Sequence, residues 1–147
     1  MPLEKEQMDA KRSTAEGKLV SIVDDDASVR VSTLRLLRWS GLRAEAFNSA
    51  EEFLRSELLA QTACLLLDVR MPGMGGLELQ QRLTEIGRRI PIVFFSARAS
   101  EEEEKRALQA GAAAFLRKPV SKEALLHAIQ SVFELPSRDN SNPSKEL

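Results

Sequence analysis

Cysteine, histidine and tyrosine are almost missing from this chain of 147 residues, which has one cysteine, one histidine and no tyrosine. The lone Cys64 excludes an intramolecular disulfide, and we interpret it as a small buried strand residue in a reducing compartment. The lone His127 excludes a histidine cluster for metal binding or acid–base catalysis. We expect it to be a surface or packing residue of the last helix.

The chain also lacks an excess of either charge and any long apolar run. Its 21 basic and 22 acidic residues give a net charge of -1, which argues against binding to nucleic acid or to an anionic membrane through bulk charge. No apolar run approaches membrane-spanning length, and residues 1–18 are too polar for a signal peptide. We therefore expect a cytoplasmic protein with one folded domain.

Composition divides the chain into three parts. Residues 1–18 mix charges with Ser, Thr and Gln and predict a flexible arm, whereas 136–147 are rich in Ser, Pro and Asn and predict a disordered tail. The folded domain is expected over 19–135. The tail is too short for a helix-turn-helix, so we expect no nucleic-acid binding by this chain.

Apolar runs alternate with amphipathic patterns five times along 19–135. The expected strands are 19–24, 42–47, 62–68, 92–95 and 113–116. The expected helices are 27–39, one that opens at Ser49 with Phe53, Leu54 and Leu58 in its apolar stripe, 76–86, one that opens at Ser100, and one capped by Ser121. This alternation predicts an α/β fold of flavodoxin-like (βα)5 type, with a parallel sheet of order 2-1-3-4-5 and helices on both faces.

Within the helices, some side chains have a default interpretation. Val31, Leu34 and Leu37 are spaced for one apolar face, and Trp39 is expected to be a packing residue. The acids of 101–104 are expected to pair with Lys105 and Arg106 along their own helix. Three arginines, Arg35, Arg38 and Arg43, are expected to form a solvated face or to bind an acidic partner.

Carboxylates follow two of the predicted strands. Asp24 and Asp25 come after the apolar run 19–23, and Asp68 comes after Leu65-Leu66-Leu67. The predicted order makes these strands neighbours, so their acids meet at the carboxyl edge of the sheet. Such acids repel one another unless a cation joins them, and a small acid set with room for waters favours Mg2+ over Ca2+. Asp26 is better interpreted as a helix N-cap.

Ser96 and Lys118 end the fourth and fifth strands at the same edge. With them, the chain resembles the receiver domain of bacterial two-component response regulators, of the single-domain type, over about 19–135. Separations of 43, 28 and 22 residues along Asp25, Asp68, Ser96 and Lys118 support the resemblance. The segments that carry it are Val23-Asp24-Asp25-Asp26, Leu67-Asp68 with Met71-Pro72-Gly73 and Gly76, Ser96-Ala97, and Lys118-Pro119.

The resemblance implies a site chemistry. Asp68 would be the phosphoacceptor, while Lys118 and Ser96 would each contact a phosphoryl oxygen. The chain would catalyse only its own phosphorylation and dephosphorylation. Its implied magnesium ligands are Asp24, Asp25, Asp68 and the backbone carbonyl of Arg70.

The resemblance also implies a switch and partners. Phosphorylation would draw Ser96 inward, let Phe115 rotate into the vacated space, and alter the surface of the fourth helix, fifth strand and fifth helix. The Lys118-Pro119 bond would be cis. Expected partners are a sensor histidine kinase or phosphotransfer protein and an output protein that binds this surface; a homodimer stays open. Two residues depart from the family's usual pattern: Ser96 stands where threonine is common, and Val120 where phenylalanine is common.

Two arginines follow the site residues at the same spacing. Arg70 and Arg98 lie two residues after Asp68 and Ser96, which suggests that they shield an acyl phosphate and slow its hydrolysis.

Other functions remain open. The chain could be the receiver portion of a DNA-binding transcriptional regulator whose effector domain is absent. A magnesium-dependent phosphohydrolase of the haloacid-dehalogenase type is remote, because it usually needs a second acid where Arg70 stands. A small-molecule binding module is disfavoured because no glycine-rich loop follows the first strand.

Overall fold

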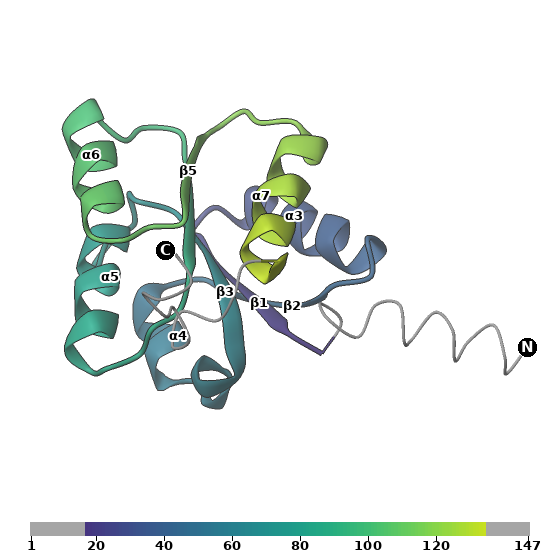
Figure 1. Ribbon diagram of the computed structural model, residues 1–147, viewed down its shortest axis with the longest axis horizontal. Helices are drawn as coiled ribbons and strands as arrows, with labels where there is room; N and C mark the ends of the chain where they lie inside the picture. Colours follow the sequence, from purple (N-terminus) through teal and green to yellow (C-terminus); the bar gives the residue numbers. More distant parts are fainter. Residues whose placement is uncertain (1–16, 135–147) are drawn as a thin grey trace, which may run out of the picture.

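All five apolar runs form strands of one parallel sheet with the order β2-β1-β3-β4-β5 (Figure 1), which confirms the predicted order and fold class. The computed structural model describes residues 17–134. Most of the predicted arm 1–18 and the whole predicted tail 136–147 lie outside these residues. The strands are β1 (Leu19–Val23), β2 (Arg43–Phe47), β3 (Thr62–Leu67), β4 (Ile92–Ser96) and β5 (Ala114–Arg117).

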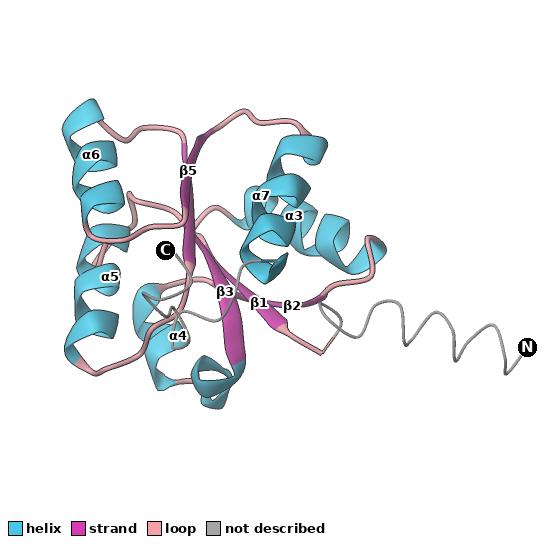
Figure 2. Cartoon of the chain, viewed as in Figure 1, coloured by secondary structure: helices cyan, strands magenta, loops and turns pink. Residues whose placement is uncertain are grey.

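Helices cover both faces of the sheet (Figure 2). One face packs against α4, α5 and α6, and the other against α3 and α7. The helices are α3 (Ala27–Trp39), α4 (Ala50–Arg55), the 3-10 helix η1 (Glu57–Gln61), α5 (Gly76–Glu85), α6 (Glu101–Gln109) and α7 (Lys122–Glu134). Among residues 17–134, no helix has both the length and the apolar character needed to cross a bilayer.

The central strands are apolar on both sides because both sides are covered. Leu65 and Leu67 of β3 point into the core beside α4, α5 and α6, whereas Leu66 points into the core beside α3 and α7. Val23 of β1 pairs with Leu67 of β3. The residues that follow this pair therefore leave the sheet at the same edge.

The helix expected to contain both Phe53 and Leu58 is divided in two. α4 ends at Arg55, and η1 follows after Ser56, whose backbone is extended at ψ 144°. The Ser56 hydroxyl accepts a hydrogen bond from the backbone N–H of Leu58 at 2.9 Å. Serine here competes with the helical hydrogen-bond pattern, which explains the break.

The apolar face expected on α3 is also partly wrong. Trp39 is 83% exposed and Val31 is 45% exposed, so neither packs in the core. The buried residues of the helix are Thr33 and Leu37, which are four apart. A spacing of three falls short of a helical turn, so successive residues at that spacing move around the helix and away from the sheet.

Candidate functional site

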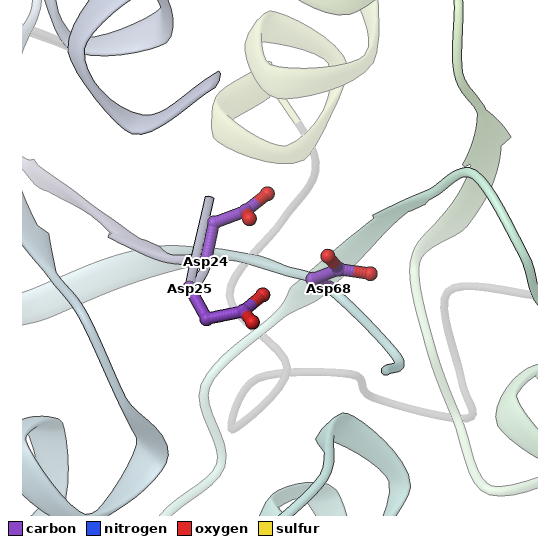
Figure 3. A group of neighbouring side chains, drawn as sticks. All are labelled: Asp24, Asp25 and Asp68. Carbon is purple, nitrogen blue, oxygen red and sulfur yellow. The ribbon is translucent and has the colours of Figure 1, made fainter. Parts of the chain in front are cut away.

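Three carboxylates meet beyond the paired ends of β1 and β3. Oxygen atoms of Asp24, Asp25 and Asp68 all lie within 4.8 Å of one another (Figure 3). Asp24 and Asp68 are 2% and 8% exposed, whereas Asp25 is exposed. The set offers oxygen ligands to a hard divalent cation while leaving one side open to solvent.

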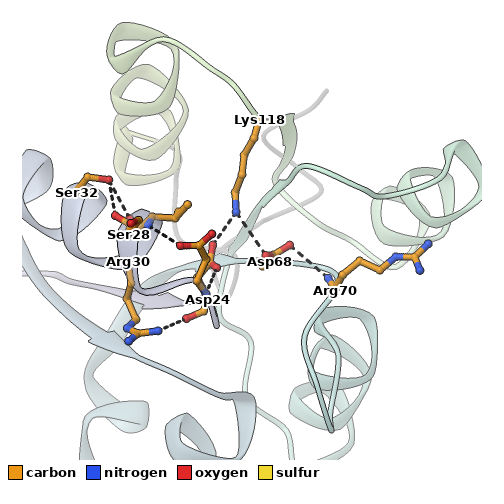
Figure 4. A network of polar contacts seen from close by, with 9 residues as sticks. Asp24, Ser28, Arg30, Ser32, Asp68, Arg70 and Lys118 are labelled. Atoms are coloured by element: carbon orange, nitrogen blue, oxygen red, sulfur yellow. Dashed lines mark hydrogen bonds and ion pairs between the residues drawn. The ribbon is translucent and has the colours of Figure 1, made fainter.

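The ammonium group of Lys118 lies between two of these acids. It donates to Asp24 Oδ2 at 2.8 Å and to Asp68 Oδ2 at 3.4 Å (Figure 4). The peptide bond that follows it, Lys118–Pro119, is cis. Burial raises the pKa of Asp24; the Lys118 and Asp26 hydrogen bonds oppose this rise, and the nearby Asp68 charge adds to it. Lys118 thus partly neutralises a cluster that is otherwise acidic.

The hydroxyl of Ser96 is buried without a hydrogen-bond partner. Ser96 is 0% exposed, and its Oγ is the one buried side-chain polar atom among residues 17–134 that lacks a partner. It lines a cavity of about 450 Å³ together with Asp25, Asp68 and Lys118. Leaving a buried polar group unpaired costs about 1–3 kcal/mol. A ligand that accepts from this hydroxyl would recover that cost.

The loop after β3 is positioned by close backbone packing. The backbone N–H of Gly76 donates to the carbonyl of Val69 at 2.9 Å. A Cβ at Gly76 would overlap the backbone oxygen of Asp68. Glycine therefore lets the start of α5 pack directly against the residue that carries the central carboxylate.

The two arginines expected near the site differ in their contacts. Both line the cavity with Asp68, but the Arg70 guanidinium extends away from Asp68 (Figure 4) and pairs with Glu103 at 2.9 Å. Arg98 is exposed and has no ion pair among residues 17–134. Of these two arginines, Arg98 is therefore the one without an ion pair in the part of the chain that the structure describes.

Phe115 is half-buried and stacks on Phe94, with 5.6 Å between ring centroids. The guanidinium of Arg117 lies 5.4 Å from the centroid of the Phe115 ring. Arg117 also donates to Glu104 Oε1 at 2.8 Å and to the carbonyl of Ala99 at 2.6 Å. The ring is therefore held between a core aromatic residue and an arginine bound to the loop before α6.

Neither the contacts of Arg117 nor the partners of Glu103 and Glu104 are evident from the sequence. Glu103 and Glu104 pair with Arg70 and Arg117. No spacing signal reveals these pairs, because the arginines lie 33 and 13 residues away from their partners along the chain. The i,i+4 pairs expected for this acidic run would join Glu101 to Lys105 and Glu102 to Arg106, and neither forms among residues 17–134. His127 is exposed, which is one of the two places expected for it.

The fold and the site together define a flavodoxin-like domain with an acidic cavity at the junction of β1 and β3, where strand order reverses. The family model for the response regulator receiver domain matches residues 20–130. The chain belongs to this family.

Similar proteins come from several bacteria. Response regulator protein TodT of Pseudomonas putida is 40% identical over 124 residues, which are 84% of this chain and 55% of TodT. Transcriptional regulatory protein TdiR of Thauera aromatica is 39% identical over 122 residues, or 83% of this chain and 54% of TdiR. The chain thus spans about half the length of these curated relatives.

Solved structures agree with the fold. The structure of response regulator StyR is 42% identical, with a TM-score of 0.77 over 88% of this chain and 66% of that one. The structure of FixJ-N is 30% identical, with a TM-score of 0.73 over 82% of this chain and 97% of that one.

Proposed function

We propose that the chain is the phosphoacceptor of a two-component phosphorelay. Asp68 takes a phosphoryl group from the phosphohistidine of a sensor kinase or phosphotransfer protein. The observation that carries the proposal is the unpaired, buried Ser96 hydroxyl, which lines the same cavity as Asp68 and Lys118. An anionic group on Asp68 would accept from both neighbours.

The transfer is an in-line displacement at phosphorus. A carboxylate oxygen of Asp68 forms the new bond to phosphorus while the bond to the histidine nitrogen breaks, and the nitrogen keeps the electron pair and takes a proton. Lys118 neutralises one phosphoryl oxygen, and Ser96 donates its hydroxyl to another. Both side chains line the cavity that holds Asp68, which supports these roles.

The acidic cluster fits Mg2+. Asp24, Asp25 and Asp68 supply carboxylates, and the backbone carbonyl of Arg70 is the fourth ligand that we assign. When bound, the ion neutralises charge on the phosphoryl oxygens. The exposed Asp25 leaves room for the waters that Mg2+ usually keeps.

The output follows from the movement of Ser96 toward the phosphoryl group. This movement frees space for the half-buried Phe115 and changes the surface of α6, β5 and α7, where an output protein binds. The chain acts in the cytoplasm, and it catalyses only its own phosphorylation and dephosphorylation.

Phosphotransfer from a purified histidine kinase, or from a small phosphodonor, tests the proposal. We expect about one labelled phosphoryl group per chain with Mg2+ present, and none in Asp68→Asn. Steady release of phosphate from a phosphomonoester would instead support the phosphohydrolase alternative. Labelling that survives in Asp68→Asn would contradict the assignment of Asp68.

A second candidate function is favoured by the length of the relatives. The chain spans only 54% of TdiR, which is named as a transcriptional regulatory protein. The chain would then be the receiver portion of a DNA-binding regulator, and its surface of α6, β5 and α7 would contact the rest of that protein. The mass of the native product in cell extract, measured by immunoblot, separates this alternative from a single-domain receiver.

A further inference from the structure

The first turn of α6 is tied to the loop that follows Asp68. Arg70 Nη2 donates to Glu103 Oε1 at 2.9 Å. The same oxygen accepts from the backbone N–H of Ser100 at 2.9 Å, and the Ser100 hydroxyl accepts from the backbone N–H of Glu103. One carboxylate therefore completes the capping box of α6 and also binds the arginine.

The backbone of Arg70 lies beside the acceptor, although its guanidinium binds the helix. Its backbone N–H donates to Asp68 Oδ1 at 3.3 Å, and the residue lines the cavity that holds Asp68 and Ser96. Among residues 17–134, Glu103 is its one ion-pair partner. The side chain is half-exposed, so no core packing fixes it in this orientation.

Phosphorylation would add a second and stronger acceptor to Asp68, two residues before Arg70. A phosphoryl group carries a charge of about -1.5 to -2 and three acceptor oxygens, whereas Glu103 carries a single charge. Arginine binds both kinds of group through paired N–H donors. Hydrogen bonds from the Ser100 backbone and from Arg70 lower the pKa of Glu103, so the competing carboxylate stays ionised near neutral pH.

We infer that Arg70 exchanges its partner on phosphorylation, leaving Glu103 for the phosphoryl group and thereby releasing the first turn of α6. This inference rests on the proposed function and adds a regulatory role for Glu103. Glu103 acts as an internal competitor that shortens the life of the phosphoryl group, because it withdraws Arg70 from shielding it. The released turn belongs to the surface through which the output protein binds.

Glu103→Gln separates this role from helix capping. Glutamine at this position can still accept from the Ser100 backbone, so α6 keeps its cap while Arg70 loses an anionic partner. We expect the phosphorylated variant to lose label about two- to fivefold more slowly than the wild type, and beryllofluoride to bind more tightly by a similar factor. Both differences should shrink at high salt, which screens the exposed pair.

The matched control is Glu102→Gln. This residue lies in the same helical turn, and its side chain has no hydrogen bond or ion pair within 17–134. The change in net charge is identical, so the lifetime should stay at the wild-type value. In an Arg70→Ala background, Glu103→Gln should have no further effect, because the group for which it competes is gone.

Three results would overturn the inference: an unchanged lifetime in Glu103→Gln, equal effects in Glu103→Gln and Glu102→Gln, or an undiminished effect without Arg70. Each is measured on protein that has been labelled. Wild-type protein that takes no label with Mg2+ and a phosphodonor would instead refute the proposed function. The two failures are therefore distinguishable.

Discussion

The buried hydroxyl of Ser96 lowers the stability of the fold, whereas the proposed phosphoryl transfer needs it. Without a ligand it has no partner among the described residues, so Ser96→Ala removes an unpaired polar atom from the core. We expect the variant to be more stable by up to about 1 kcal/mol in chemical denaturation, yet slower to take a phosphoryl group. Lower stability with an unchanged labelling rate would mean that the hydroxyl has a structural role instead.

Asp24 also lowers the stability of the fold, although it belongs to the proposed metal site. Its pKa is raised above the ordinary 3.8 mainly by burial, so the ionised form is less favourable in the folded chain than in the unfolded one. The resulting destabilisation is complete above the folded-state pKa and disappears as the pH falls toward 3.8. Without divalent ions, Asp24→Asn should therefore raise the melting temperature at pH 7.

The pH series is the test of this explanation. The gain in melting temperature should decrease as the pH falls through the raised pKa of Asp24 and should vanish near the ordinary value. A gain that stays constant down to that pH would assign the effect to some property of asparagine other than its lack of charge.

At the scale of elements, the close contact between α5 and the end of β3 depends on the absence of a Cβ at Gly76. A Cβ on Gly76 would overlap the Asp68 carbonyl and lie 3.0 Å from Val69 Cα. Gly76→Ala should cost about 1–3 kcal/mol of unfolding free energy and shift Asp68. Gly17→Ala is the matched control, since no described atom beyond its chain neighbours lies within 4 Å of its added Cβ. Equal costs in the two variants would exclude the clash.

Elements with a strong local signal could be predicted from the sequence. β1 and β3 consist mostly of buried apolar residues, and the capping box of α6 is a local pattern that the structure confirms. The break at Ser56 could not be predicted, because a serine hydroxyl can bind the backbone inside or outside a helix. The exposure of Trp39 depends on how α3 rotates against the sheet, which is set by long-range packing.

The same limit applies to the site. Strand ends could place Asp24, Asp68, Ser96 and Lys118 at one edge, because parallel strands present their carboxyl ends together. The arginine contacts could not be foreseen. Of the acids of α6, only Glu101 and Glu102 have a basic residue four positions later. Only the folded chain shows that Arg70 and Arg117 reach Glu103 and Glu104.

At the scale of the whole molecule, α6 is the one described helix held by ion pairs from both sides. Arg70 from the β3 loop binds Glu103, and Arg117 from the end of β5 binds Glu104 and the carbonyl of Ala99. Arg70 lies two residues after Asp68, and Arg117 lies directly before Lys118. A change of charge in the cavity can therefore reach the helix through two separate contacts.

Binding of Mg2+ should stabilise the entire fold, because the ligand carboxylates come together only when β1 and β3 pair. At 100 times its dissociation constant, an ion that binds only the folded state adds about 2.7 kcal/mol, and a chelator should remove this gain. Asp25→Asn tests the site without disturbing the fold. Asp25 is exposed, and its side chain has no hydrogen bond or ion pair in the part of the chain described. Without the ion, the variant should therefore melt like the wild type. Its gain on adding Mg2+ should be much smaller. An equal gain in both proteins would place the ion elsewhere, and no gain in the wild type would contradict the metal site.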